Sequence, residues 1–269
     1  MLVFKSNLGH NCRVICPRQF AMSESKQTFD EMGFVVERSF VSADEIKTIL
    51  SRLKLIIEEQ LRSLPREHVF YEDRKVAGSL KQIQQLQLHD EFFMQTMNGK
   101  PRQLAEELLG EPVEVINLQY FNKPAGIGKP TPAHQDVYYF KLSPCSAVTM
   151  WLALEDVDEE NGCVRYLPRS HRCGIRPHKS TGTLGFSQGI EGYPSASELE
   201  QEIAIQATAG DLLAHHALTI HRADGNQSRC RSRQALGFIF YGVSAKVDQD
   251  AHQAYQQKLK SNLIAEGKI

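Results

Sequence analysis

The stretch GDLLAHHALTIHRADGNQSRCRSRQALGFIFYG, residues 210–242, consists of two apolar runs joined by a polar segment. The last run is rich in aromatic residues, and both runs have the length and composition of β-strands. The segment between them contains Gly225 and Asn226, which favour a turn. The stretch therefore predicts a β-hairpin with His221 before its turn and Arg233 at the start of the returning strand.

Short apolar runs separated by turn residues continue through the chain from Val113 onward. The predicted strands in this region are 113–121, 135–140, 147–154, 163–167, 203–207, 211–216, 218–221 and 233–242. About eight strands behind a helical region favour a closed or two-sheet architecture. We therefore expect a mainly β fold with a helical cover, specifically a double-stranded β-helix (jelly roll, cupin-like) flanked by N-terminal helices.

The region before Val113 has the apolar spacing of helices. Its predicted elements are a strand at 34–36, a helix from the capping box into 46–61, and short helices at 89–98 and 101–109. Ser42 and Glu45 form the capping-box pattern that begins the long helix, and Gly110 is suited to end the last one. Residues 65–88 show no regular pattern. A polar helix is also expected within 248–269.

The charge balance and apolar content of the chain limit the kinds of partner that it is expected to bind. The chain has 269 residues, 41% of them hydrophobic and 23% charged, and 31 basic against 32 acidic residues give a formal net charge of −1. This balance provides no global field for nucleic acid or an anionic membrane, and no stretch approaches the roughly 18 apolar residues of a membrane span. We expect small-molecule partners, no nucleic acid and no membrane span, and the sequence leaves the oligomeric state open.

The six cysteines contain no C-x-x-C pair, which favours reduced thiols and a cytoplasmic protein. Residues 1–21 include three basic residues and no acid, and a second methionine follows at Met22. We therefore expect 1–21 to be a poorly ordered or alternative-start extension and 22–269 to be a single domain.

The stretch PAHQDVYYF, residues 132–140, contains an H-x-D pair. In a strand, alternate side chains share a face, so His134 and Asp136 would project to the same side. They could fill adjacent positions of an octahedral metal, but a third ligand has to come from another strand. The candidates are His171, His178, one of His215 and His216, and His221.

Arg233 follows His221 by twelve residues, at a position where the returning hairpin strand would bring its guanidinium toward the metal. Two histidines and one carboxylate form a facial triad, which in non-haem Fe(II) enzymes leaves positions open for a 2-oxo acid and dioxygen. The rigid fork of arginine suits the far carboxylate of such a cosubstrate. Arg231 is the rival, because alternate residues of a strand share a face.

Four ordered blocks of the sequence resemble the phytanoyl-CoA dioxygenase family of Fe(II)/2-oxoglutarate oxygenases. They are GFVVERSFVSADEI, FNKPAGIGKPTPAHQD, WLALEDVDEENGCVRYLPRSH and GDLLAHHALTIHRADGNQS…RSRQAL. The resemblance runs from about Phe29 to about Gly242.

The resemblance implies that His134, Asp136 and His221 bind Fe(II) and that Arg233 anchors the C5 carboxylate of 2-oxoglutarate. Further cosubstrate contacts are implied for Trp151, with weaker candidates in Lys81 and in Gln119 or Tyr120. The implied reaction uses O2 to hydroxylate a C–H bond and releases succinate and CO2, with ascorbate as a possible reductant. The presence of Asp136 favours hydroxylation over halogenation, because related halogenases lose this carboxylate.

Residues 161–190 carry five basic residues and no acid. This loop could cover a carboxylate, phosphonate or phosphate of the substrate, or it could be a solvated loop balanced by the acidic residues 155–162. Tyr138, Arg169 and Arg176 are the candidate substrate contacts. Arg169 stands where many family members have glycine, so its backbone either differs from theirs or tolerates strain.

We therefore expect a dioxygenase that hydroxylates a small, anionic metabolite. The alternatives are an acyl-CoA hydroxylase of the same mechanism and a non-catalytic jelly-roll protein that only binds a metal. A metal-dependent hydrolase is disfavoured, because no dedicated general base is evident beside the metal pair.

Overall fold

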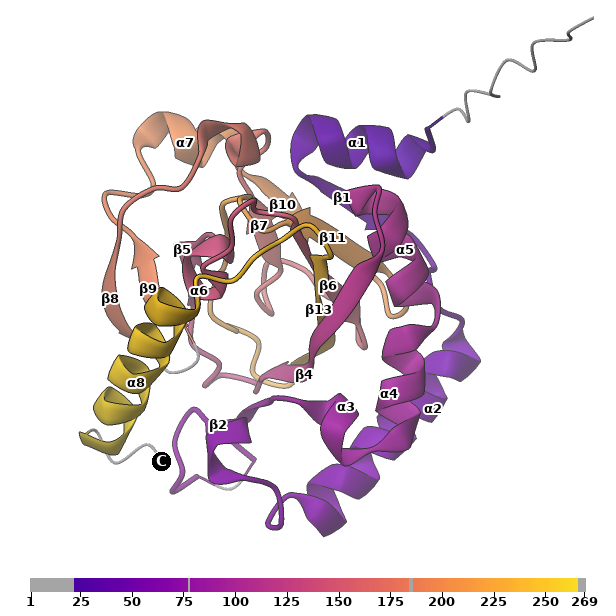
Figure 1. Ribbon diagram of the computed structural model, residues 1–269. Coiled ribbons are helices and arrows are strands. Elements are labelled where there is room, and N and C mark those ends of the chain that lie inside the picture. Colours follow the sequence, from indigo (N-terminus) through magenta and orange to yellow (C-terminus); the bar gives the residue numbers. More distant parts are fainter. Residues whose placement is uncertain (1–21, 77, 184–185, 266–269) are drawn as a thin grey trace, which may run out of the picture.

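The computed structural model describes residues 22–76, 78–183 and 186–265, so the expected extension at 1–21 lies outside the described residues. Two antiparallel sheets face each other, and helices cover the outer face of the larger one (Figure 1). The expected mainly β, jelly-roll architecture with a helical cover is confirmed.

The larger sheet has seven strands and the smaller has four. In spatial order the large sheet contains β1 (Phe34–Glu37), β11 (Leu212–His216), β6 (Ala147–Ala153), β13 (Arg233–Gly242), β4 (Val113–Lys123), β3 (Leu80–Ile83) and β2 (Val69–Tyr71). The small sheet contains β10 (Ile203–Ile205), β7 (Val164–Tyr166), β12 (His221–Ala223) and β5 (Thr131–His134). A separate hairpin of β8 (His178–Thr183) and β9 (Phe186–Ile190) lies beside β5.

Strand β6 shows how residue alternation divides the core. Val148, Met150 and Leu152 pack in the cluster between the large sheet and the helices. Trp151 and Ala153, on the opposite face, pack in a second cluster that also contains Tyr166 of the small sheet. The space between the sheets is therefore lined by every second residue of β6, as strand geometry requires.

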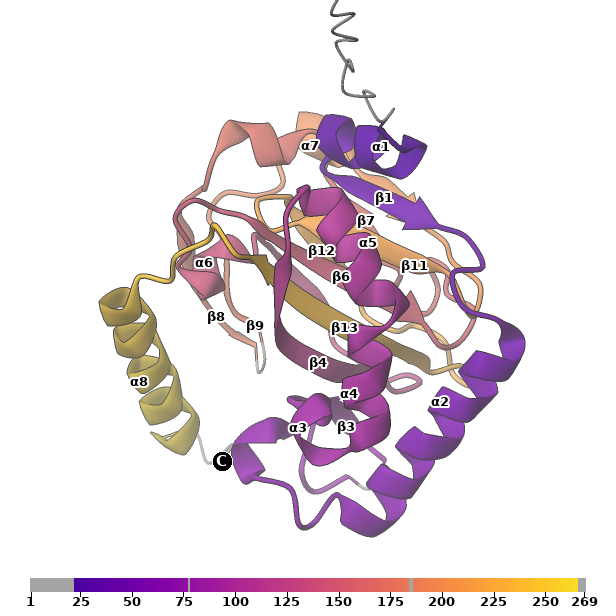
Figure 2. The same cartoon turned by 45° about the vertical axis from the view of Figure 1, so that its right-hand side comes forward.

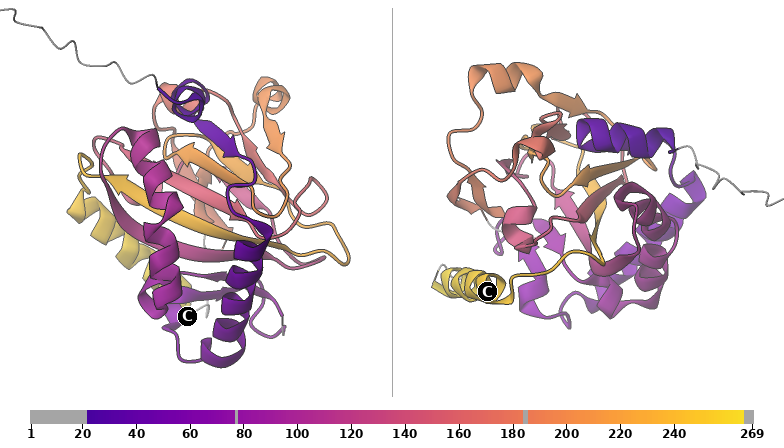
Figure 3. Two further views of the ribbon diagram at one scale, coloured as in Figure 1. Left: turned by 90° about the vertical axis from the view of Figure 1, so that its right-hand side faces the viewer. Right: turned by 45° about the horizontal axis from the view of Figure 1, so that its top comes forward.

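The helical cover is formed mainly by α2 (Ala43–Leu55), α4 (Glu91–Asn98) and α5 (Lys100–Leu109), which lie along the large sheet (Figures 2 and 3). The capping box expected at Ser42 and Glu45 is present, and α5 ends at Gly110 with φ 72°. The remaining helices are α1 (Glu24–Met32), η1 (Ile56–Gln60), η2 (Arg66–His68), α3 (Leu86–His89), α6 (Val137–Phe140), η3 (Ser170–Cys173), α7 (Ala196–Gln201) and α8 (Gln249–Ala265).

Three local predictions were wrong. Residues 137–140 form the helical turn α6 instead of a strand, and the strand predicted at 218–221 begins only at His221. The region 65–88, predicted to be irregular, contributes β2 and β3 to the edge of the large sheet. Each of these elements is only three or four residues long, so its tertiary partners decide its conformation more than its own composition does.

Helix α1 and strand β1 are joined closely to the loop around η3. The Arg169 N–H donates to Met32 O at 2.8 Å, and the His216 N–H donates to Gly33 O at 2.9 Å. Gly33 has φ 85°, and a Cβ there would lie 2.4 Å from Nδ1 of His171, so only glycine fits. Arg169 has φ 62°, so this arginine adopts the left-handed backbone conformation that favours glycine.

Helix α8 confirms the helix expected within 248–269, and Tyr255 packs edge-on against Tyr139 of α6. Within the described residues no helix combines the length and apolarity needed to cross a bilayer.

Candidate metal and cosubstrate site

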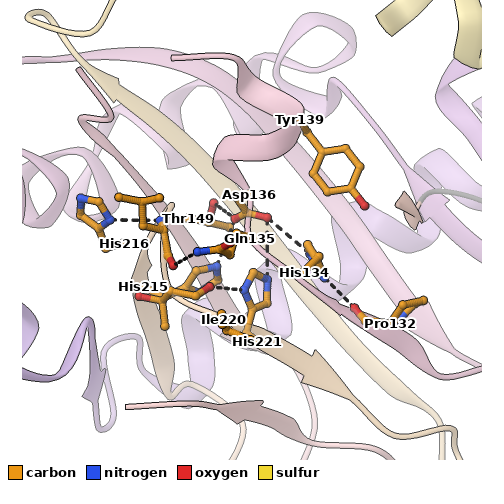
Figure 4. A network of polar contacts seen from close by, with 12 residues as sticks. Pro132, His134, Gln135, Asp136, Tyr139, Thr149, His215, His216, Ile220 and His221 are labelled. Atoms are coloured by element: carbon orange, nitrogen blue, oxygen red, sulfur yellow. Dashed lines mark hydrogen bonds and ion pairs between the residues drawn. The ribbon is translucent and has the colours of Figure 1, made fainter. Parts of the chain in front are cut away.

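His134, Asp136 and His221 come together between the two sheets. His134 ends β5, His221 begins β12, and the two residues are paired across the small sheet. Asp136 is the residue that precedes α6, with helical φ −60° and ψ −34°, so the H-x-D pair is brought together by a strand end and a helical turn. One ligand atom from each residue lies within 4.8 Å of the others (Figure 4).

Backbone carbonyls orient both imidazoles. The His134 Nδ1–H donates to Pro132 O at 2.7 Å, and the His221 Nδ1–H donates to Thr219 O at 3.0 Å. Each ring therefore presents the lone pair of Nε2 toward Asp136, whose Oδ1 lies 3.4 Å from His134 and 3.7 Å from His221. This tautomer is the one that ligates a metal through Nε2.

The second oxygen of Asp136 is held by two other side chains. Thr149 donates to Oδ2 at 2.5 Å, and His215 Nε2 lies 3.1 Å from the same atom. His215 is itself hydrogen-bonded through Nδ1 to the Tyr166 hydroxyl at 3.0 Å. Because Oδ2 is occupied in this way, Oδ1 is left pointing between the two imidazoles.

The electrostatics favour a metal-binding protonation state. Burial, reinforced by His215 and His134, lowers the pKa of His221 well below its usual value, so its ring is neutral near pH 7. Burial acts to raise the pKa of Asp136, but interactions with His221, His134 and His215 outweigh this effect and hold it well below its usual value. A neutral imidazole and an ionised carboxylate are the forms that ligate cations.

A cavity of about 100 Å³ extends from the triad toward the start of β13. Arg233 lines it, is 5% exposed, and has its guanidinium carbon 5.1 Å from the ring centre of Trp151. Its Nε has no hydrogen-bond partner, and among the described residues no carboxylate forms an ion pair with it. Burial lowers the pKa of Arg233 to about 10, so it remains charged near pH 7. The cavity thus contains a buried cation that lacks an anion.

Two lysines lie in the same cavity. Lys81 forms an ion pair with the buried Glu72 at 3.3 Å. Lys123 lies opposite Arg233 in the sheet and donates to the carbonyl oxygens of Ala223, at 3.3 Å, and Asp224, at 2.5 Å. Burial, together with Arg233 and Lys81, lowers the pKa of Lys123 well below its usual value. This end of the cavity is suited to a negatively charged ligand.

The structure places seven of the predicted site residues along this cavity. They are Lys81, Gln119, His134, Asp136, Trp151, His221 and Arg233. Tyr120 points to the other face of β4, where its hydroxyl donates to Gln234 at 2.8 Å, so the choice between Gln119 and Tyr120 falls to Gln119 as the cavity residue.

The other predicted site residues do not line the cavity. Arg231, the rival of Arg233, forms a surface ion pair with Asp158 at 2.8 Å. Tyr138 does not share a face with the triad, because it lies on α6, where its ring stacks on His178. Arg169 and Arg176 form ion pairs with Glu31 and Glu198. Neither arginine has a free guanidinium facing the triad.

Sequence reasoning missed Lys123 and Thr149. Both could have been found from the alternation of side chains along a strand, because residues an even number of positions apart share a face. Lys123 is four residues after Gln119 on the same strand, and Thr149 is two residues before Trp151. The sequence predicted that one of His215 and His216 would face the metal-binding residues without deciding which. It is His215 that lies buried beside Asp136, while His216 packs near Phe29.

Comparison with known proteins agrees with this geometry. The chain is 26% identical over 224 residues to the peroxisomal phytanoyl-CoA dioxygenase of Mus musculus, a match that covers 77% of this chain but only 64% of the mouse protein. It is also 26% identical to a probable alpha-ketoglutarate-dependent hypophosphite dioxygenase of Stutzerimonas stutzeri, with 83% of this chain and 78% of that protein covered.

Solved structures share the fold. The carbocyclase SnoK from nogalamycin biosynthesis superposes with a TM-score of 0.66 at 25% identity, covering 88% of this chain and 91% of SnoK. EctD from S. alaskensis, crystallised with 2-oxoglutarate and 5-hydroxyectoine, gives a TM-score of 0.67 at 18% identity, covering 83% of this chain and 77% of EctD. The sequence model described as phytanoyl-CoA dioxygenase (PhyH) matches residues 29–235, which include the triad and Arg233, and the chain therefore belongs to the phytanoyl-CoA dioxygenase family.

Proposed function

We propose that this protein is an Fe(II)- and 2-oxoglutarate-dependent dioxygenase that hydroxylates a C–H bond of a small, anionic metabolite. The observation that carries the proposal is the pairing of a His-Asp-His cluster with a buried, unpaired arginine at the other end of one cavity. Neither feature alone would distinguish this activity from simple metal binding.

The residues present fit Fe(II). Two neutral imidazole nitrogens and one carboxylate oxygen form the donor set of a facial triad, which leaves coordination positions for other ligands. His134, Asp136 and His221 would hold the ion, and Thr149 with His215 fixes the carboxylate. Bound Fe(II) would supply the activation of dioxygen, coupled to decarboxylation of 2-oxoglutarate to succinate and CO2.

The cavity fits the cosubstrate. The Arg233 guanidinium would form charge-assisted hydrogen bonds with the C5 carboxylate, and Trp151 would cover it. Lys81 and Gln119 provide further polar groups on the same wall. Because Arg233 is buried, its unpaired charge is costly until an anion binds. A protein that only bound a metal would have no use for this cation, which disfavours the non-catalytic alternative.

Three features of the expected function stay predictions: an acyl-CoA substrate, a cytoplasmic location and stimulation by ascorbate. An acyl-CoA substrate would have to be bound by groups other than Arg165, Arg169 and Arg176, since each of these pairs with an acidic side chain of the protein. A cytoplasmic location and a stimulating effect of ascorbate are likewise retained as expectations.

The test measures two quantities on purified protein: calorimetric binding of 2-oxoglutarate in the presence of Fe(II), and succinate formation in the presence of O2 and ascorbate. We expect both in the native protein and neither in His134→Ala, because the triad loses one of its three ligands. His252→Ala on α8 is the matched control and should retain both. Binding of iron without any binding of 2-oxoglutarate would instead favour a metal-binding protein without turnover.

A further inference from the structure

The arginines expected to meet an anionic substrate are already engaged within the protein. Arg165 pairs with Glu159 and Asp224, Arg169 with Glu31, and Arg176 with Glu198, while Arg172 donates to the carbonyl of Asp30. These acids come from four separate parts of the chain, and only Glu159 belongs to the acidic segment 155–162. Three of the four arginines of this loop are therefore ion-paired within the protein and the fourth is hydrogen-bonded to a carbonyl, so we expect the cation that meets the substrate to lie elsewhere.

Lys141 is a basic residue of a different kind. It ends α6 with a left-handed backbone, φ 56° and ψ 46°, which is uncommon for a lysine. Its backbone N–H donates to Val137 O and its carbonyl accepts from the Asp248 N–H, so the conformation is fixed on both sides. Strained backbone of this kind is concentrated at functional sites.

The Lys141 side chain returns over α6, and its Nζ lies 3.9 Å from the centre of the Tyr138 ring. Among the described residues no carboxylate forms an ion pair or hydrogen bond with this ammonium, although Asp248 acts on it at longer range. Partial burial lowers the pKa of Lys141, so the ammonium has lost part of its hydration without gaining a counter-ion.

A stack of rings connects Lys141 with the metal-binding segment. The Tyr138 ring lies on His178 with centres 4.2 Å apart and an interplanar angle of 21°. The His178 Nε2 accepts a hydrogen bond at 3.2 Å from the backbone N–H of Gln135, the residue between His134 and Asp136. Contacts therefore run from Lys141 through Tyr138 and His178 to the backbone between His134 and Asp136.

This stack lies outside the cosubstrate cavity. None of its three members lines that cavity, which extends instead toward Arg233. Tyr139, the neighbour of Tyr138 on α6, meets His134 edge-on with ring centres 5.7 Å apart, and Figure 4 shows it descending from the α6 turn beside His134. The α6 side of the triad is thus formed by residues that do not line the cosubstrate cavity.

We propose that Lys141, Tyr138 and His178 form the substrate-recognition surface, and that the Lys141 ammonium binds an oxyanion of the substrate, a carboxylate or a phosphonate. This inference rests on the proposed dioxygenase function. Because two stacked rings separate Lys141 from the triad, the charged group of the substrate lies several bonds from the carbon that is oxidised. The surface thus selects substrates with a charged end remote from the reacting C–H bond.

The test uses the Fe(II)-loaded protein with 2-oxoglutarate and compares succinate formation across medium-chain carboxylic acids and alkylphosphonates, each beside its neutral methyl ester. We expect acids or phosphonates, but not their esters, to stimulate turnover. Lys141→Gln should lower kcat/KM for the best anion at least about tenfold, mainly through KM, because one charge-assisted contact is lost. Lys141→Arg should recover most of the loss.

Lys179→Gln is the matched control, because Lys179 is an exposed residue of β8 beside His178 and its removal changes the net charge equally. It should leave kcat/KM unchanged. The inference is overturned if no anion exceeds its ester, or if Lys141→Gln and Lys179→Gln behave alike. Calorimetric binding of 2-oxoglutarate distinguishes failure of the Lys141 assignment from failure of the proposed function. If 2-oxoglutarate binds but turnover shows no preference for anionic compounds, only the Lys141 assignment is rejected. If 2-oxoglutarate does not bind, the proposed function is rejected as well.

Discussion

Replacing Arg233 by methionine should change two properties in opposite directions: 2-oxoglutarate affinity should fall while the stability of the ligand-free protein rises. Arg233 is 5% exposed, and its Nε has no partner. Burial lowers the pKa of Lys123, and repulsion from the Arg233 charge lowers it further. Methionine removes this repulsion and can still pack on Trp151.

The magnitudes follow from the contacts. Two charge-assisted hydrogen bonds to a carboxylate contribute about 1.5–3 kcal/mol each, so their loss should weaken binding at least about 100-fold. A buried polar group without a partner costs about 1–3 kcal/mol. If the substitution removes a cost of about 1 kcal/mol, Tm of the ligand-free protein should rise by about 2–4 °C for a domain of this size.

The assay is thermal unfolding of native and variant protein with and without 2-oxoglutarate, supported by calorimetric titration. At a ligand concentration of about 100 times the native Kd, the native protein should gain about 2.7 kcal/mol, whereas Arg233→Met, with at least about 100-fold weaker binding, should gain at most about 0.4 kcal/mol. Arg231→Met is the control, because it breaks only the surface pairs with Asp158 and Glu160 and should bind 2-oxoglutarate like the native protein. A variant that binds 2-oxoglutarate within about threefold of the native affinity would refute the assignment of Arg233.

Two further changes probe the residues behind the triad. His215→Phe removes one of the two groups that hold Oδ2 of Asp136, so Fe(II) affinity should fall about 10–100-fold in a metal titration, and an unchanged affinity would contradict the positioning role. Burial lowers the pKa of His216 to about 4, so the native state takes up fewer protons than the unfolded state below pH 6.5. The metal-free protein should therefore lose on the order of 3 kcal/mol of unfolding free energy as pH falls from 6.5 to about 4. Chemical unfolding at several pH values should show a smaller loss in His216→Asn. An equal dependence of unfolding free energy on pH in the two proteins would exclude His216 as the cause.

The sequence predicted that His134, Asp136 and His221 would lie together, and they do, but part of the reason given for it was wrong. Alternation along a strand was expected to bring His134 and Asp136 to one face, but the strand ends at His134 and Asp136 begins a helical turn. The run that follows is β-branched and aromatic, which favours a strand, yet the Val137 N–H donates to Ala217 O of another loop. A contact between segments so distant in sequence overrides local propensity and cannot be inferred from it.

The basic loop, residues 161–190, is a second case in which contacts with distant segments could not be inferred from the local sequence. Its arginines are visible in the sequence, but their partners include Glu31, Glu198 and Asp224, which the fold brings from both ends of the chain. A local count of charge therefore left open whether the loop covers a substrate anion or is balanced by residues 155–162, whereas the structure pairs its arginines mostly with acids outside that segment. The strand positions of Lys123 and Thr149, in contrast, follow from simple alternation and could have been predicted.

Strand β1 is the edge strand of the large sheet, and it protects the strand that carries His215. Its pairing with β11 uses backbone groups of 212–215 that would otherwise be bare on that side. A chain shortened past Glu37 would turn β11 into an exposed edge with a row of unpaired N–H and C=O groups, which is a template for association with a second molecule. Aggregation of such a truncated protein, and distortion of the site formed by His134, Asp136 and His221, would then have one cause, so a shortened version for crystallisation should keep Phe34–Glu37.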